Sequence, residues 1–147
     1  MKRCYLFDID GTLADIRHRL HHIERTPKDW DAFFADCVDD LPFAHVCELA
    51  RDLDRAGQTI VFVSGRSDRV RIETRQWICE HVVLFDRPLY MRSQGDHRPD
   101  HVVKGELLEQ VRADGYWPIM AFDDRNQVVE MWRAKGIPCA QVADGNF

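Results

Sequence analysis

Residues 59–63 read TIVFV, an unbroken run of β-branched and aromatic side chains. A strand without a polar face has to be covered on both sides, which is typical of parallel sheets with helices packed on both faces. Other runs with strand character occur at residues 4–7, 118–122 and 139–142. The chain is therefore expected to bury several strands in one sheet.

Segments with helical periodicity alternate with these strands. They comprise residues 44–56, 67–80, 100–113 and 127–135, with Ser67 as the expected N-cap of the second. One more strand is expected between the second and third of these helices, at residues 82–85 or at residues 89–91. The alternation predicts right-handed βαβ crossovers and an α/β fold, with a mostly parallel sheet flanked by helices on both faces.

The length of 147 residues suits one domain with a real core, so residues 1–147 are expected to form a single domain. Between the first strand and the first long helix, residues 15–42 are expected to form a small helical insertion. This insertion carries Trp30, Phe33 and Phe34 at helical spacing. The spacing favours core packing of an added helix over stacking of these rings on nucleobases.

Composition narrows the class of protein. With 45% hydrophobic and 31% charged residues, the chain is typical of soluble globular proteins and unlike disordered ones. No apolar run approaches the roughly 20 residues of a membrane helix, and an acid follows too soon after the start for a signal peptide, so we expect no membrane contact and a cytoplasmic location. Five scattered cysteines without a CxxC pair argue against a disulfide framework and a structural zinc site.

The formal net charge of −5 offers no general attraction to nucleic acid, so a phosphate-rich partner would need a local basic patch. Arg66, Arg69, Arg71 and Arg75 could form such a patch, or could lie on a solvated helix face. The sequence leaves both interpretations open, and it predicts no oligomeric state.

Polar residues gather where the predicted strands end. Asp8 and Asp10 follow the first strand, Ser64 follows residues 59–63, and Asp123 and Asp124 follow residues 118–122. In an open parallel sheet, ligands bind outside the carboxyl ends of the strands. Lys104 belongs to the helix before the last of these strands and could lean over the same edge. We therefore expect a functional site there.

The residue types at this edge indicate phosphoryl chemistry. Clustered carboxylates repel one another and need a cation, and Mg²⁺ prefers oxygen ligands. A carboxylate at a metal can attack a phosphoryl group and form an aspartyl-phosphate. A second acid can protonate the leaving oxygen and then activate water. Backbone N–H groups after Gly11, the Ser64 hydroxyl and the Lys104 ammonium could stabilise the phosphoryl oxygens.

The order of these motifs resembles the haloacid dehalogenase (HAD) superfamily of phosphotransferases. The four motifs are DIDGTL at residues 8–13, Ser64-Gly65-Arg66, Lys104, and Asp123-Asp124. The resemblance implies the HAD-like Rossmannoid fold. A closer resemblance, to the 3′-phosphatase domain of T4-type polynucleotide kinase/phosphatases, is carried by residues 61–66 (VFVSGR), 94–96 (QGD), 100–104 (DHVVK), 123–133 (DDRNQVVEMWR) and 144–147 (DGNF).

The closer resemblance implies a role for each matching residue. Asp8 would be the nucleophile and a metal ligand. Asp10 would be the general acid/base and would also give its backbone carbonyl to the metal. Ser64 and Lys104 would bind the phosphoryl group, and Asp123 would complete the Mg²⁺ site.

The same resemblance implies a wider site. Substrate-binding residues would be Gly11, Thr12 and Arg66, and the supporting carboxylates would be Asp100 and Asp124. Asp100 could orient Lys104, which stands four residues later. One arginine after the first motif is expected to contact substrate, and Arg17 and Arg19 compete for that place. His97 and His101 flank the third motif as further candidate contacts.

The expected activity is removal of a 3′-phosphate from a nucleic-acid end or a nucleoside 3′-phosphate. One alternative is a HAD phosphatase of a small metabolite or a 5′-nucleotide. Another is a non-catalytic module that binds nucleic-acid ends and partners a separate kinase or ligase. The sequence contains no GxxxxGK[ST] loop, so the kinase half of that family is expected to be absent from it.

Overall fold

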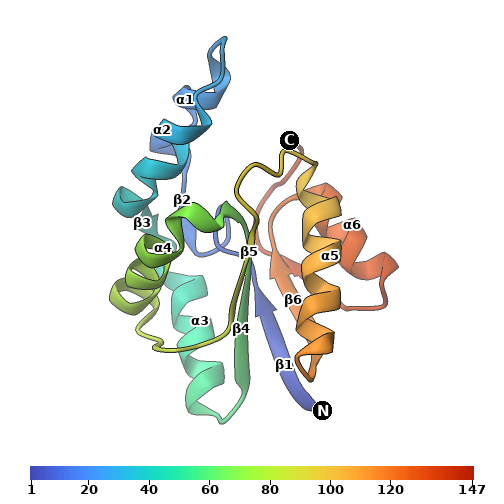
Figure 1. Ribbon diagram of the computed structural model, residues 1–147. Helices are drawn as coiled ribbons and strands as arrows, with labels where there is room; N and C mark the ends of the chain where they lie inside the picture. The colour runs from blue at the N-terminus through green and yellow to red at the C-terminus, as the bar shows by residue number, and fades with distance from the viewer.

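The computed structural model describes residues 1–147 and contains a five-stranded parallel sheet in the order β5-β4-β1-β6-β7. The strands are β1 (Lys2–Phe7), β4 (Thr59–Ser67), β5 (Leu89–Arg92), β6 (Tyr116–Asp123) and β7 (Cys139–Gln141). The main helices are α3 (Ala44–Arg55), α4 (Arg71–Trp77), α5 (Asp100–Ala113) and α6 (Asn126–Ala134). In Figure 1, α3 and α4 lie on one side of the sheet and α5 and α6 on the other. The predicted α/β architecture is confirmed.

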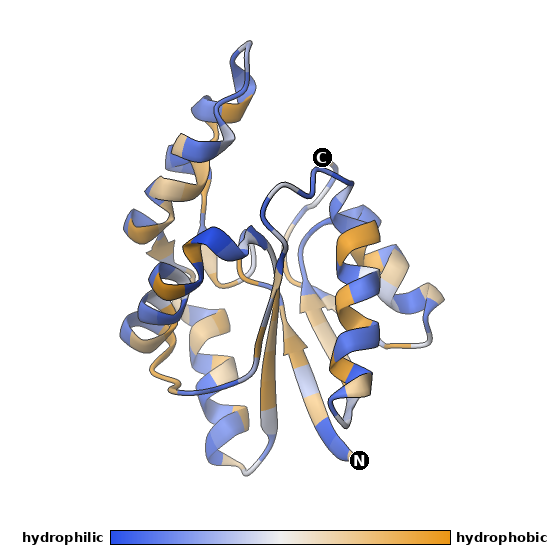
Figure 2. Cartoon of the chain, viewed as in Figure 1, coloured by the Kyte–Doolittle hydropathy of each residue, from blue (hydrophilic) through white to orange (hydrophobic).

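Strand β4 contributes to two hydrophobic cores, one on each face of the sheet. Ile60 and Phe62 belong to the core on the α3 side, and Val61 and Val63 to the core on the α5 side. None of the four is more than 1% exposed. Figure 2 shows the same arrangement, with hydrophobic colour along the central strands. Burial on both faces explains why residues 59–63 have no polar side.

The structure decides between the two candidate strands and corrects one helix. The additional strand is β5, at the second of the two candidate segments, whereas residues 82–85 begin at the last residue of a turn of π-helix, η4 (Ile78–Val82), and contain Val83 in the left-handed region at φ 61°. The helix expected at residues 67–80 is three pieces, namely the 3-10 turn η3 (Asp68–Val70), α4 and η4. Ser67 ends β4, and its side chain accepts a hydrogen bond from the Arg69 N–H, so it caps η3.

The insertion after β1 leaves and rejoins the domain through a two-stranded antiparallel ribbon. Strands β2 (Ala14–Asp15) and β3 (Leu41–Pro42) pair with Ala14 opposite Pro42. Between them lie η1 (Arg17–Arg19), α1 (His21–Glu24), α2 (Trp30–Ala35) and η2 (Asp36–Asp39). Figure 1 shows that the insertion projects beyond the edge of the sheet where β1 and β6 end. It therefore overhangs the edge at which the sequence places the functional residues.

No helix of the structure combines the length and the apolar character needed to cross a membrane. The longest, α5, has 14 residues and carries charged residues along its length.

Candidate active site

The ends of β1 and β6 bring the first and last acidic motifs together. The Asp8 N–H donates a 3.0 Å hydrogen bond to the carbonyl oxygen of Phe122, which joins the two strand ends. Lys104 Nζ, from α5, donates to Asp8 Oδ1 at 2.7 Å and to Asp123 Oδ2 at 2.9 Å. All three side chains are at least 95% buried. Residues from three elements of the parallel sheet fold therefore meet at one edge, as the sequence predicts.

Asp124 completes a group of three buried acids, which together with Lys104 we call the carboxylate cluster. One oxygen from each of Asp8, Asp123 and Asp124 lies within 4.8 Å of the others. Burial and the neighbouring Asp123 raise the pKa of both Asp8 and Asp124. Burial opposes the charge on Lys104, but its acidic neighbours, Asp100 first, outweigh burial and raise its pKa.

The carboxylate cluster has the chemistry of a site for a hard divalent cation. Three carboxylates face one ammonium group, which leaves uncompensated negative charge in a buried place. Their oxygens are the donors that Mg²⁺ prefers. Asp124, to which the sequence analysis assigns a supporting role, offers a ligand atom as close as those of Asp8 and Asp123. The residues present therefore fit the ion that the sequence analysis expects.

Asp123 is held by donors from two directions. Its Oδ1 accepts hydrogen bonds from the N–H groups of Asp124 and Arg125, at 2.9 and 3.3 Å. Its Oδ2 accepts from Lys104 and, at 3.2 Å, from Nε1 of the buried Trp132 on α6. Trp132 falls within the motif of residues 123–133, and the sequence alone assigns it no role. The structure shows that this indole orients the Asp123 carboxylate.

The turn after β1 is shaped by contacts with Asp124. Gly11 has φ 84°, and a Cβ at this position would collide with the Asp124 carboxylate, so only glycine fits. Thr12 Oγ1 donates to Asp8 Oδ2 at 2.9 Å and lies 3.3 Å from Asp124 Oδ1. The N–H groups of Gly11 and Thr12 already donate to carbonyl oxygens within the turn. What the structure shows for both residues is support of the acids, and substrate binding by them stays a prediction.

A second polar group, the arginine cluster, consists of Asp10, Arg19, Asp40 and Arg66. Asp10 Oδ1 accepts from Arg19 Nη2 at 2.9 Å and from Arg66 Nε at 2.7 Å. Asp40 Oδ2 accepts from both guanidinium groups at 2.8 Å. Burial works against the charge of Asp10, but Arg66 and Arg19 outweigh it and hold its pKa below the ordinary value. The Asp10 side chain is thus fixed beside the carboxylate cluster.

The two arginines that compete in the sequence occupy different environments. The Arg17 side chain is 78% exposed and pairs with Asp15. The Arg19 side chain has no exposed area and donates to Asp10, to Asp40 and to the carbonyl oxygen of Phe33. Arg19, and not Arg17, therefore lies at the site, where it contacts the carboxylate of Asp10.

Asp40 is a site residue that the sequence analysis missed. It lies at the C-terminal end of the insertion, just before β3, and its side chain is fully buried. Besides both arginines, His18 Nε2 lies 2.7 Å from its Oδ1, and Trp77 Nε1 donates to its carbonyl oxygen at 2.9 Å. In the sequence it is the second acid of an Asp-Asp pair ahead of a helix, which is typical of a solvated turn. No local signal distinguishes it.

Ser64 lies on β4, and Asp100 is the first residue of α5. Ser64 is fully buried, and its Oγ accepts a 3.1 Å hydrogen bond from the Arg66 N–H, so its own O–H remains free to donate. Asp100 Oδ2 lies 3.5 Å from Lys104 Nζ, four residues on in the helix. A Cβ at Gly65 would collide with the Asp100 carboxylate, so this glycine lets α5 approach β4.

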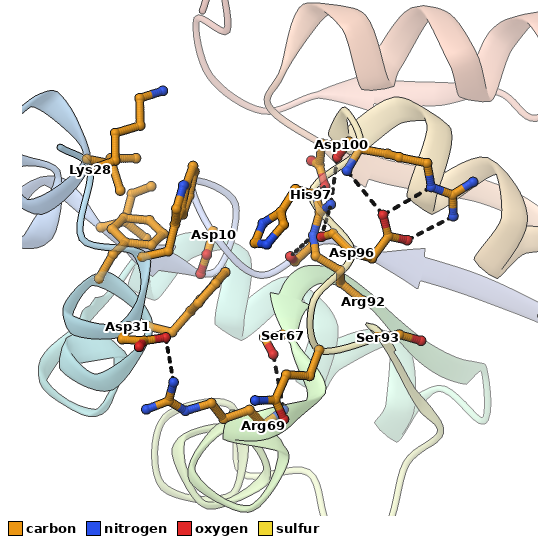
Figure 3. Close-up of a pocket in the computed structure, with 18 of the residues that line it drawn as sticks. Asp10, Lys28, Asp31, Ser67, Arg69, Arg92, Ser93, Asp96, His97 and Asp100 are labelled. Carbon is orange, nitrogen blue, oxygen red and sulfur yellow. Dashed lines mark hydrogen bonds and ion pairs between the residues drawn. The ribbon is translucent and has the colours of Figure 1, made fainter. Parts of the chain in front are cut away.

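A pocket of about 460 Å³ opens above Asp8, Asp10 and Asp124. One wall is the insertion, including Ile16, Leu20, Ile23, Lys28, Trp30, Asp31, Phe33 and Phe34. The opposite wall is the polar loop of residues 92–98, in which Arg92 donates to the carbonyl oxygens of Gly65, Asp96 and Arg98. Figure 3 shows His97 pointing into this space, with Asp10 between the walls. His101 does not line the pocket.

The four arginines of residues 66–75 do not form one patch. Arg66 is buried, and Arg69 pairs with Asp31 across the pocket. Arg71 donates to the carbonyl oxygen of Leu89, at the start of β5, and Arg75 donates to that of Arg87, just before this strand. Only Arg69 of this set lines the pocket.

The sequence of this chain matches a known family along almost its whole length. Residues 2–147 match the family described as the polynucleotide kinase PNKP phosphatase domain, within the HAD group. A protein of Autographa californica nuclear polyhedrosis virus, named as a bifunctional polynucleotide kinase/RNA ligase, is 31% identical over 136 residues. That match covers 92% of this chain but 18% of the viral protein.

Solved structures agree with this match. A chain of the Pnkp1/Rnl/Hen1 RNA repair complex superposes with a TM-score of 0.84 at 29% identity, and a second structure of that complex gives 0.83 at 30%. Both matches cover 100% of this chain, which spans 44% and 47% of the two matched chains. The class C acid phosphatase from Bacillus anthracis, at 14% identity and a TM-score of 0.69 over 99% of this chain and 66% of its own, shares the fold.

Proposed function

Because the chain belongs to the phosphatase-domain family of polynucleotide kinase PNKP and is thus a HAD phosphatase, we propose that it removes 3′-phosphates from nucleic-acid ends or nucleosides. The proposal includes dependence on Mg²⁺ and an aspartyl-phosphate intermediate. The observation that carries it is the Asp8 carboxylate on the pocket floor, bonded to Lys104 and Thr12 beside two further buried acids.

The carboxylate cluster would hold the ion. Asp8, Asp123 and the main-chain carbonyl of Asp10 are the proposed ligands, and Asp124 is a further carboxylate within reach. No main-chain N–H group donates to the carbonyl oxygen of Asp10, which leaves it for this purpose. Bound Mg²⁺ would supply positive charge to neutralise the phosphoryl oxygens.

The first half-reaction would form the intermediate on Asp8. One oxygen of the Asp8 carboxylate attacks phosphorus, and the bond between phosphorus and the substrate's 3′ oxygen breaks. Asp10 gives a proton from Oδ2, the oxygen that does not accept from the arginines, to the departing oxygen, so that an alcohol leaves. Because the two arginines favour the carboxylate form of Asp10, this step requires the negative charge of the bound phosphate to raise the Asp10 pKa. Lys104 and the free O–H of Ser64 would contact the oxygens of the transferred group, and Asp100 would keep Lys104 in place.

The second half-reaction would return Asp8 to its starting form. Asp10, now a carboxylate, takes a proton from a water molecule as the water oxygen attacks phosphorus. The bond between phosphorus and the Asp8 oxygen breaks, inorganic phosphate leaves, and Asp10 again carries the proton. The arginine cluster holds Asp10 in one position for both steps.

The nucleic-acid substrate rests on the family and on the relatives. One relative is named as a polynucleotide kinase/RNA ligase, and another is part of an RNA repair complex. This chain matches a part of each, so we propose that it acts beside a separate kinase or ligase activity. The pocket opens beside the insertion without being closed by it, which leaves room for the end of a polymer.

A substrate panel tests the proposal. Phosphate release with Mg²⁺ is measured on 3′-phosphate oligonucleotides, 3′-mononucleotides, 5′-mononucleotides and sugar phosphates, with Asp8→Asn as the background. We expect kcat/KM for 3′-phosphates to be at least about ten times that for the other esters, since positioning of the substrate governs such ratios. A preference for sugar phosphates or 5′-nucleotides would replace the proposal with the metabolite alternative. Tight binding of ends with no phosphate release would replace it with the non-catalytic module.

A further inference from the structure

The two walls of the active-site pocket differ in chemistry. The loop wall presents polar and charged groups, whereas the insertion wall presents an aromatic surface formed by Trp30 and Phe34 over Phe33. We call these three residues the aromatic platform. Resting on the proposed function, we propose that the platform binds the nucleobase of the nucleotide whose phosphate is removed.

The platform is an ordered stack of rings. Trp30 and Phe34 lie with ring centres 6.0 Å apart and planes 28° from parallel. Phe33 meets Trp30 edge-on at 5.7 Å and Phe34 at 5.5 Å. The Phe33 ring, 5% exposed, lies 4.3 Å from the Arg19 guanidinium carbon, so the platform is supported by the arginine cluster. Its rings are therefore fixed relative to Asp10.

Core packing does not account for Trp30. Phe34 packs against the hydrophobic core on the α3 side, as the sequence analysis expects of this aromatic group. Trp30 is not among the residues of either core, is 39% exposed and lines the pocket. An aromatic surface that lies open in the same pocket as Asp8 and Asp10 is typical of a ligand site.

The platform is also tied across the pocket to the rest of the domain. Asp31, next to Trp30 on α2, pairs with Arg69 of η3, and Figure 3 shows this pair joining the two sides of the pocket. Asp29 caps α2 by accepting a hydrogen bond from the Ala32 N–H at 3.0 Å. The contact between Phe33 and Arg19 and the cap by Asp29 order the aromatic platform before a ligand arrives, which lowers the entropic cost of binding.

A nucleobase is the occupant that fits both walls. Its flat face can stack on aromatic rings, and its edge can hydrogen-bond to the loop wall, where His97 points into the pocket (Figure 3). Lys28 Nζ lies 5.7 Å from the centre of the Trp30 ring, which places a positive charge where the preceding phosphodiester could lie. A sugar phosphate has no face to stack. The platform would therefore make nucleotides, of any base, the preferred class of substrate.

The test compares two oligonucleotides that both end in a 3′-phosphate and differ only in the last residue, which either carries a base or is an abasic tetrahydrofuran. Truncating an aromatic ring that stacks on a base typically weakens binding by about 5- to 150-fold. We expect wild-type kcat/KM to favour the base-containing oligonucleotide within that range. Trp30→Ala should remove the preference, and Trp30→Phe should keep most of it.

The matched control is Trp117→Ala. Trp117 is 51% exposed on β6, opposite Arg3 of β1, and does not line the pocket. Its loss should leave the ratio unchanged. Equal kcat/KM for the two oligonucleotides in the wild type, or an equal loss on both in Trp30→Ala, would overturn the platform while the phosphatase assignment stands.

An equilibrium measurement separates this inference from the proposed function. Asp8→Asn and the double variant Asp8→Asn/Trp30→Ala are titrated with fluorescein-labelled forms of the two oligonucleotides, and binding is followed by anisotropy. Tighter binding of the base-containing form, lost in the double variant, supports the platform even if no variant releases phosphate. Equal affinities for both forms overturn it, whatever the activity.

Discussion

Asp8 and Asp10 stand two residues apart in the chain but belong to clusters with different net charges. The carboxylate cluster around Asp8 has an excess of acids, and the arginine cluster around Asp10 is balanced. The first opposes three buried carboxylates with one ammonium group. The second pairs two carboxylates with two guanidinium groups. Accordingly, the pKa of Asp8 is raised by burial and Asp123, while that of Asp10 is lowered because Arg66 and Arg19 outweigh its burial.

This difference separates two tasks at one strand end. In a cluster with excess negative charge the carboxylates repel one another, and binding of a cation relieves this repulsion. A balanced cluster needs nothing further and can hold a side chain in place. We infer from the comparison that the carboxylate cluster is the part of the site that binds a cation, and that the arginine cluster is the rigid part that fixes the position of Asp10. The variants below test that division.

The largest effect is expected for Asp8→Asn. An amide is not a nucleophile, so phosphate release should fall by more than about 10³-fold, while the melting temperature stays close to that of the wild type. The control is Asp52→Asn, which removes an exposed carboxylate on α3 that does not line the pocket. Activity within a few-fold of the wild type would show that Asp8 is not the nucleophile.

Asp10→Asn should cost about 10²- to 10⁴-fold on a 3′-phosphate oligonucleotide, because an amide neither donates the proton to the leaving alcohol nor activates water. The substrate p-nitrophenyl phosphate has a leaving group that needs no proton. Its first turnover should survive as a burst of p-nitrophenol, followed by slow hydrolysis. Loss of the burst would contradict the role of Asp10 as the acid.

Asp40→Asn tests the rigid part. It leaves two buried guanidinium groups facing one carboxylate, and breaking a buried pair typically costs about 3–5 kcal/mol of unfolding free energy. Urea denaturation measures the loss. The control is Asp36→Asn in the same insertion, where the side chain is 45% exposed and pairs with His22. Equal stability of the two variants would mean that the arginine cluster is not balanced by Asp40.

Asp124→Asn should have the opposite sign from Asp40→Asn in the absence of metal. Removing one acid relieves repulsion in the carboxylate cluster, so the metal-free protein should melt no lower than the wild type. Mg²⁺ at a hundred times its Kd should stabilise the wild type by about 2.7 kcal/mol, and the variant by less. EDTA should abolish wild-type activity, with recovery on adding Mg²⁺. A wild-type melting curve that ignores Mg²⁺ would contradict the metal site.

The smallest effect is expected for Arg17→Ala. This side chain is exposed and pairs with Asp15 outside both clusters, so kcat/KM should change by less than about two-fold. Arg19→Ala, by contrast, removes a buried partner of both Asp10 and Asp40 and should resemble Asp40→Asn in stability. A loss of kcat/KM in Arg17→Ala as large as the loss in Arg19→Ala would mean that Arg17 reaches the substrate.

Periodicity was enough to predict the sheet and its helices. The alternation of a fully buried strand with amphipathic helices leaves few topologies, and residues 59–63 fit the interior position between β5 and β1 that they occupy. Where the pattern left a choice open, the two candidate segments had similar hydrophobicity. Residues 82–85 and 89–91 are both short apolar runs, and only the pairing with β4 selects the second. Likewise, nothing local breaks the helix expected at residues 67–80 into three parts.

The site was predictable where strand ends position the residues, and less so where the insertion does. Asp8 and Asp123 follow parallel strands, so the topology brings them together. Arg17 and Arg19 stand in one turn, and the choice between them depends on Asp40, which lies 21 residues from Arg19. A contact of that kind is a property of the packed insertion. Its acid cannot be told from other loop acids by sequence spacing.

The short ribbon of β2 and β3 makes the insertion a segment that can be exchanged for another. Its two ends leave the domain side by side, so segments of different length can be grafted between them at little entropic cost, about 0.6 kcal/mol for each doubling of a flexible loop. Arg19 and Asp40 set the limit of such exchange, because both lie inside the insertion. Arg19 donates to Asp10, and Asp40 accepts from both arginines that hold Asp10. A graft that keeps these two residues could acquire a new substrate preference while leaving the chemistry of the strand ends intact.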